Sequence, residues 1–199
     1  MRAEDLRAAL ARPWVHGEAA DLRGAEFQEP VDLSDMALAG FDLRGARFQA
    51  PVTARGAQFL GLSWFGGCHF AQGLDLSGAL FINDARFEEC TFAGPVDFAG
   101  AEFRGIARFD HARFAGPARM PALTCYGNLS FDGADFARPL DLAGAECLGG
   151  FWGHGARFAQ GSDFADTQIH GRLWLRGARE GNAALSEGRF GLSFGYTYI

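Results

Sequence analysis

Large apolar residues recur along most of this chain at steps of five and six residues. In the stretch Val96–Phe114 they are Phe98, Phe103, Phe109 and Phe114. These steps match neither the 3.6-residue period of a helix nor the two-residue period of a strand, so the chain must turn between one phenylalanine and the next. The pattern predicts a coil that is wound repeatedly.

The steps alternate regularly from Leu43 to Leu175, which makes units of 11 residues and pairs of units of 22 residues. Residues 22 positions apart should therefore stack on adjacent coils. One column at this spacing contains only phenylalanine: Phe48, Phe70, Phe92, Phe114, Phe136 and Phe158. A second inward position, often alanine, precedes most of these apolar residues by two, as a narrow filled interior requires. We expect an all-β solenoid with about 22 residues per coil.

The two ends of the chain depart from this pattern. Residues 1–19 place Leu6 and Leu10 at helical spacing before Pro13, which predicts a short helix capping the open end of the coil. Residues 20–176 form the repeat. Residues 177–199 alternate apolar with small or polar residues, which predicts a strand with one apolar face, either a C-terminal cap or a dimerisation tail.

Composition excludes several classes of protein. The 199 residues include 28 Gly, 20 Phe and 18 basic residues, all arginine, with a formal charge of −6. Without lysine there is neither a P-loop lysine nor a Schiff-base amine. No enzyme motif is present, and the isolated histidines predict no metal site, so we expect neither catalysis nor a cofactor. No apolar run is long enough to cross a bilayer, and the N-terminus is unlike a signal peptide; we therefore expect a cytoplasmic protein.

The four cysteines form two pairs at the coil spacing, Cys68 with Cys90 and Cys125 with Cys147. Parallel stacking points such side chains the wrong way for an easy disulfide. In a reducing compartment we expect free thiols that act as small buried hydrophobes.

Residues just before each apolar position point outward, and the 22-residue period sorts them into faces. One face carries a column that we name the acidic stripe: Asp75, Asp97, Asp141 and Asp163, interrupted by Arg119. The stripe is either a site for a protein partner or a set of consensus residues that serve solubility and local hydrogen bonds. The opposite face is mildly basic.

A further face carries tryptophans at outward positions, Trp64, Trp152 and Trp174, the last two on adjacent coils. Exposed stacked tryptophans need a cover, either the C-terminal tail or a second subunit. We expect a homodimer together with tail packing, because aromatic residues and arginine are enriched at interfaces. The interface candidates are Trp152, Trp174, Phe190, Phe194 and Tyr196.

Units such as ADLRG, ARFQA, AEFRG, ADFAR and ARFAQ resemble the pentapeptide-repeat family over about residues 20–176. The resemblance implies a right-handed quadrilateral parallel β-helix with four repeat units per coil. It also implies protein binding, because the quinolone-resistance and toxin-immunity members are dimeric rods that imitate duplex DNA and bind DNA gyrase or topoisomerase IV. The acidic stripe is compatible with that role. The 18 arginines and the basic face are not what a polyanion mimic needs.

Three functions therefore stay open. The first is a non-enzymatic binding module that acts through protein–protein interaction, as a DNA-mimicking modulator of gyrase or topoisomerase IV or with another partner. The second is a structural scaffold rod. The third is ligand binding on a shelf formed by Trp152 and Trp174. Direct nucleic-acid binding is disfavoured by the net charge and by the absence of lysine clusters.

Overall fold

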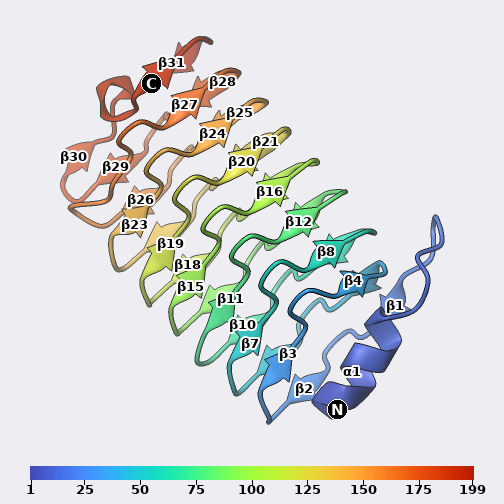
Figure 1. Cartoon of the computed structure of the whole chain (residues 1–199). Helices are drawn as coiled ribbons and strands as arrows, with labels where there is room; N and C mark the ends of the chain where they lie inside the picture. Colours follow the sequence, from blue (N-terminus) through green and yellow to red (C-terminus); the bar gives the residue numbers. More distant parts are fainter.

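The computed structural model describes all 199 residues and confirms the predicted fold class. Short parallel strands form the sides of successive coils, and each strand stacks on its counterpart in the next coil, so that four sheets run along the molecule (Figure 1). Sheet A consists of β1 (Ala20–Asp21), β5 (Phe41–Asp42), β9 (Ser63–Trp64), β13 (Ala85–Arg86), β17 (Ala107–Arg108), β21 (Asn128–Ser130), β25 (Gly150–Trp152), β28 (Arg172–Trp174) and β32 (Thr197–Tyr198). Sheet B consists of β2 (Glu26–Phe27), β6 (Arg47–Phe48), β10 (His69–Phe70), β14 (Thr91–Phe92), β18 (Arg113–Phe114), β22 (Asp135–Phe136), β26 (Arg157–Phe158), β29 (Arg179–Glu180) and β30 (Ala183–Ala184).

The other two sheets complete each coil. Sheet C consists of β3 (Val31–Asp32), β7 (Val52–Thr53), β11 (Leu74–Asp75), β15 (Val96–Asp97), β19 (Ala118–Arg119) and β23 (Leu140–Asp141). Sheet D consists of β4 (Ala37–Leu38), β8 (Gln58–Phe59), β12 (Leu80–Phe81), β16 (Glu102–Phe103), β20 (Thr124–Cys125), β24 (Glu146–Cys147), β27 (Gln168–Ile169) and β31 (Leu192–Ser193). The chain passes from sheet A to B, C and D and then enters sheet A of the next coil.

The strand register confirms the 22-residue coil. Phe70 pairs with Phe48 on one side and with Phe92 on the other. The rings of the phenylalanine column stack with centroids 4.2 to 5.4 Å apart. The last coil is longer, since Ile169 pairs with Ser193.

A left-handed turn explains the 11-residue rhythm. Positive φ angles recur every 11 residues, at the corners between sheets A and B and between sheets C and D: Gly45, Gly56, Gly67, Gly78, Glu89, Gly100, His111, Ala122, Gly133, Gly144, Gly155, Asp166 and Gly177. Glycine adopts this conformation without steric cost, which is why it fills most of these positions.

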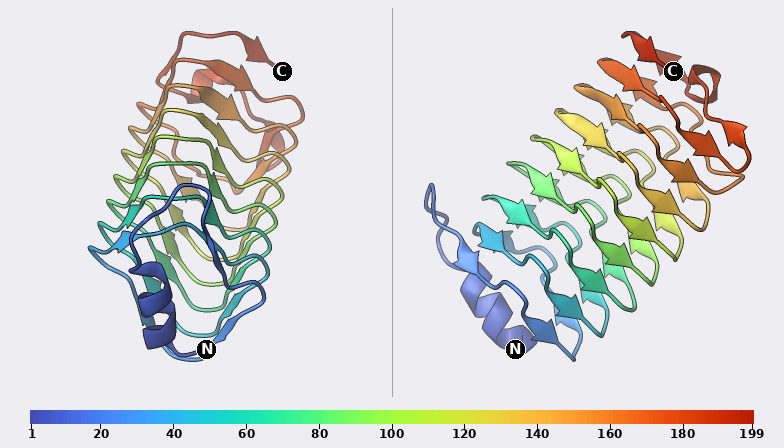
Figure 2. Two further views of the ribbon diagram at one scale, coloured as in Figure 1. Left: turned by 90° about the vertical axis from the view of Figure 1, so that its right-hand side faces the viewer. Right: turned by 180° about the vertical axis from the view of Figure 1, so that it is seen from behind.

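Helix α1 (Ala3–Leu10) lies across the N-terminal end of the solenoid (Figure 2). Its residues Leu6 and Leu10 are fully buried and line a small apolar cavity together with interior residues of the first coils, including Phe41. Capping is needed here because the apolar interior of a solenoid would otherwise meet water. None of the helices could span a membrane.

The C-terminal segment differs from the predicted single strand. β29 and β30 form an antiparallel pair, the 3-10 helix η1 (Glu187–Arg189) follows, and β31 and β32 then continue sheets D and A. The coil therefore continues beyond residue 177. Phe190 is buried against Phe151 and Phe164, so its assignment as an interface residue was wrong. The alternating pattern does not predict the turn at Glu187–Arg189, after which the ring of Phe190 points inward.

All four cysteines are free and buried. Cys125 and Cys147 are strand partners on adjacent coils, as the spacing predicted. Burial raises the pKa of the Cys125 thiol to about 12 and raises that of Cys147 well above its ordinary value.

We expect all four thiols to be unreactive toward a disulfide reagent in the native protein, because the reagent cannot reach buried side chains. After denaturation without reductant, all four cysteines should titrate. A thiol count of two in denaturant would contradict the assignment.

Candidate protein-interaction surface

The acidic stripe is one continuous column on sheet C. Asp75 pairs with Asp97, Asp97 with Arg119, and Arg119 with Asp141, which forms a bridge to Asp163. Each aspartate also accepts a hydrogen bond from the backbone N–H two residues later, for example Asp97 from Ala99 at 2.8 Å. These bonds are the local role that a repeat consensus requires.

Arginines partly neutralise the stripe. Arg55 Nε lies 2.6 Å from Asp75, and Arg119 Nη1 lies 2.9 Å from Asp97. Burial disfavours the charged form of Asp75, but the hydrogen bonds from Ser77 and Arg55 outweigh it, so the pKa of this carboxyl lies below its ordinary value. Asp163 is the one stripe residue without an arginine partner. The stripe is therefore a mixed surface of carboxylates and guanidinium groups.

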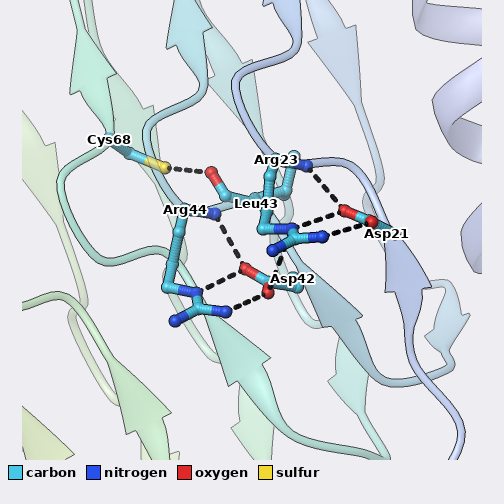
Figure 3. A network of polar contacts seen from close by, with 6 residues as sticks. All are labelled: Asp21, Arg23, Asp42, Leu43, Arg44 and Cys68. Carbon is cyan, nitrogen blue, oxygen red and sulfur yellow. Dashed lines mark hydrogen bonds and ion pairs between the residues drawn. The ribbon is translucent and has the colours of Figure 1, made fainter.

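Sheet A begins with two Asp–Arg pairs at the N-terminal end of the solenoid (Figure 3). Arg23 holds Asp21 through two hydrogen bonds of 2.8 and 2.7 Å, and Arg44 holds Asp42 through two of 2.8 and 2.6 Å. The hydrogen bonds from Arg23 lower the pKa of Asp21 to about 2, and those from Arg44 hold the pKa of Asp42 below its ordinary value. Both carboxylates therefore stay ionised throughout the physiological range.

Replacing Asp42 with asparagine should lower the free energy of unfolding at pH 7 by about 1–2 kcal/mol, because the largely buried carboxylate loses its charged hydrogen bonds to Arg44. The pKa of Asp42 is lower in the folded chain than its ordinary value of 3.8, so this stabilisation is present above that value. It is lost as the pH falls below 3.8 and through the folded-state pKa. Urea unfolding of both proteins at pH 7 and in acid tests this; a difference that persists in acid would contradict it.

Trp64 lies further along sheet A, between two arginines. The guanidinium groups of Arg44 and Arg86 lie 4.8 and 5.8 Å from its ring centroid. Together with glycines and two glutamates they line a hollow of about 530 Å³. Because cations already cover the indole, Trp64 offers little aromatic surface to another molecule.

Three aromatic residues close sheet A at its C-terminal end. Trp152 pairs with Trp174, and Trp174 pairs with Tyr198 of β32. The ring centroids are 5.6 and 5.5 Å apart. Both tryptophans are half-buried, because the last coil extends the sheet over them. The tail therefore supplies part of the cover that the sequence predicted.

The corner between sheets D and A carries large apolar side chains in most coils. From β8 onward, each crossing has one residue after the sheet D strand, a middle residue, and one residue before or at the start of the sheet A strand. The first and last of these form two rows that flank the corner, and together they are the apolar edge. The first row is Leu60, Ile82, Arg104, Tyr126, Leu148, His170 and Phe194, and the second row is Leu62, Asp84, Ile106, Asn128, Gly150, Arg172 and Tyr196.

Exposure singles out this edge. Leu62 is 42% exposed, Tyr126 53%, Phe194 62% and Tyr196 80%. Trp14, also exposed, lies beside Gly61 in the loop after α1. Figure 1 shows this loop on the side where the corners after β4, β8 and β12 lie. Four of the ten exposed large hydrophobic side chains of the molecule thus lie on the apolar edge, and the last residues of the chain, Tyr198 and Ile199, follow Tyr196.

A column of glycines separates the two rows in the C-terminal half of the edge. A Cβ added to Gly127 would lie 2.5 Å from the carbonyl oxygen of Gly105, and one added to Gly149 would lie 2.5 Å from the backbone of Gly127. The same crowding occurs at Gly171 and Gly195. Successive coils approach so closely here that only glycine fits, which leaves bare backbone between two rows of side chains.

The structure places the predicted interface residues in three environments. Phe194 and Tyr196 lie on the apolar edge, Trp152 and Trp174 lie on the adjoining face of sheet A, and Phe190 is in the core. The sequence analysis missed the rest of the edge. The 22-residue period contains the signal for this edge, because Leu60, Ile82, Tyr126 and Leu148 follow that spacing. In the sequence analysis, only the residues before each apolar position were assigned to faces, and these four residues come after one.

No group of three or more His, Cys, Asp or Glu side chains lies close enough together to hold a metal ion. The polar clusters of the molecule are ion pairs and turn hydrogen bonds.

Comparisons with known proteins bear on the fold. A family model described as pentapeptide repeats (9 copies) matches residues 22–80 and 76–121, half of the chain. A search of curated protein sequences found no match. Among solved structures, the chain is similar to HetL, a pentapeptide repeat protein involved in heterocyst differentiation regulation from the cyanobacterium Nostoc sp. strain PCC 7120. The alignment has 15% identity, covers 100% of this chain and 95% of HetL, and has a TM-score of 0.23.

Proposed function

Because the chain belongs to the pentapeptide-repeat family, we propose that it is a non-catalytic protein-interaction module that contacts its partner through the apolar edge. The observation that carries the proposal is the concentration of exposed large hydrophobic side chains there, from Leu62 through Tyr126 to Phe194 and Tyr196. Exposed apolar side chains that lie close together, as Phe194 and Tyr196 do at the end of this edge, commonly mark a site of protein association.

The DNA-mimicking role of gyrase-binding relatives would use the acidic stripe instead. Arg55 and Arg119 occupy that face and pair with Asp75 and Asp97, which interrupts any extended negative potential. For this reason we place the partner on the apolar edge. Binding to DNA gyrase or topoisomerase IV stays a prediction of the family resemblance, and a supercoiling assay at micromolar protein tests it.

Ligand binding on a tryptophan shelf has less support from the geometry. Trp174 lies between Trp152 and Tyr198 with their rings tilted by 50° and 34°, and both indoles are half-buried, so little flat surface remains for a sugar ring. A scaffold role would need no exposed apolar surface at all.

A pull-down from the host cell tests the proposed surface. The bait is the intact tagged chain in three forms: wild type, an edge variant with Leu62, Tyr126 and Phe194 changed to serine, and a stripe variant with Asp75, Asp97, Asp141 and Asp163 changed to asparagine. The three edge residues are exposed, so serine should leave the core intact. We expect the stripe variant to retain the partner and the edge variant to lose it. Loss by the stripe variant alone would overturn the proposal.

A further inference from the structure

The two rows of the apolar edge have the same number of positions on either side of their middle. Tyr126 stands at the centre of the first row and Asn128 at the centre of the second, with three residues of each row on either side. Asp84 lies two coils before Asn128, and Arg172 lies two coils after it. The negative charge of Asp84 in one half thus corresponds to the positive charge of Arg172 in the other half.

Neither of these two residues has an ion-pair partner within the chain. Arg172 is exposed and forms no ion pair or side-chain hydrogen bond. Asp84 accepts one hydrogen bond at Oδ1 from the backbone N–H of Ile106, at 3.0 Å, and has no arginine partner. Arg104, the other arginine of the edge, is paired, since its Nε lies 2.9 Å from Glu102.

The ends of the edge match in the same reversed sense. Leu60 and Leu62 in one half correspond to Phe194 and Tyr196 in the other, each three coils from the centre. The aliphatic end also has Trp14 beside it, and the aromatic end has the most exposed rings of the edge. The aliphatic side chains of one end can therefore pack against the exposed aromatic rings of the other end.

From this arrangement we infer that the partner on the apolar edge is a second copy of this chain, bound side by side and antiparallel about a two-fold axis at Tyr126. This inference rests on the proposed function, because it names the occupant of the same surface. Each row then faces the same row of the other copy in reverse. Asp84 of one protomer meets Arg172 of its partner twice, and Leu62 meets Tyr196 twice.

A parallel arrangement would not satisfy the same residues. It would place the first row of one protomer opposite the second row of the other, coil by coil. Arg172 would then face His170 of the other protomer, and the two aromatic ends would face each other. The two unpaired charges would stay unpaired, and such a complex would lose the electrostatic complementarity that selects one orientation. The antiparallel dimer is thus favoured by the match between Asp84 and Arg172 and by the match between the two apolar ends.

Charge reversal in the full-length protein tests the inference by sedimentation velocity. Wild type should be dimeric at micromolar concentration, and Asp84→Arg or Arg172→Asp should each weaken dimerisation by about tenfold or more, because each introduces two like-charge contacts. The double variant, or an equimolar mixture of the two single variants, should recover dimerisation to within about threefold of wild type, because both contacts are again of opposite sign. Arg47→Asp on sheet B is the matched control and should have no effect.

The outcomes separate this inference from the proposed function. A wild-type protein that stays monomeric, or a dimer indifferent to both single reversals, would overturn the antiparallel pairing. If the edge variant still lost a different protein in the pull-down, the proposed function would stand without it. Recovery in the mixture supports the inference directly and shows that the single variants are folded.

Discussion

Phe114→Ala is expected to lower the free energy of unfolding by about 3–5 kcal/mol, as large-to-small changes in a packed core do. The ring is buried and stacked between Phe92 and Phe136, with centroids 4.7 and 4.2 Å away. Its removal leaves a cavity. The neighbouring coils cannot move in to fill this cavity, because the hydrogen bonds between parallel strands fix the distance between coils. Urea denaturation followed by circular dichroism measures the change.

Phe114→Leu is the matched control, since it keeps most of the volume and should cost only about 1 kcal/mol. An alanine variant as stable as the leucine variant would mean that the phenylalanine column contributes little to the stability of the rod.

Gly149→Ala is expected to destabilise the protein by about 1–3 kcal/mol or more, the usual range for forcing extra atoms into a packed site. The new Cβ would lie 2.5 Å from backbone atoms of Gly127, which cannot rotate away as a side chain could. Two coils would have to separate at the corner between sheets D and A. The measurement is again the midpoint and slope of urea unfolding.

Gly66→Ala provides the comparison for this prediction. Gly66 lies at a corner between sheets A and B, and a Cβ there would meet its nearest neighbour at an ordinary 3.6 Å. We expect this change to be nearly neutral. Equal destabilisation by both substitutions would show that close coil contact at Gly149 is not the cause.

The period of the apolar residues predicted the fold well, because in a solenoid the interior repeats with the coil. The column from Phe48 to Phe158 follows from spacing alone and matches the strand register. The same period placed Asp75 and Asp97 side by side. A periodic sequence therefore gives the sheets, their register and the outward columns.

The partners of the outward residues were harder to predict. Arg55 reaches Asp75 from a turn in the preceding coil, and Arg119 reaches Asp97 from the next strand of the same sheet. Long flexible side chains choose among several neighbours, and the 22-residue period does not say which. The sequence therefore suggested a more acidic surface than the structure has.

The C-terminal coil and the glycine column depend on geometry that spacing does not encode. The last coil is longer than the others, so the alternation after Arg189 no longer reports which residues face inward, and Phe190 was misplaced. Gly127 and Gly149 follow the 22-residue period in the sequence, but the reason for glycine there is the distance between two backbones. The turn glycines such as Gly144 have a different reason for being glycine, since their φ is positive.

The most direct test of the central claim is a photo-cross-linking amino acid placed on the apolar edge at position 126, in place of Tyr126, compared with one at position 113 on sheet B, in place of Arg113. Both side chains are exposed in the single chain, so they differ mainly in the surface that they report. Irradiation of the purified full-length protein should give a covalent dimer joined through the residue at position 126 in both copies, and none from position 113. Cross-linking from position 113 alone would contradict the account, because it would place the interaction surface away from the apolar edge.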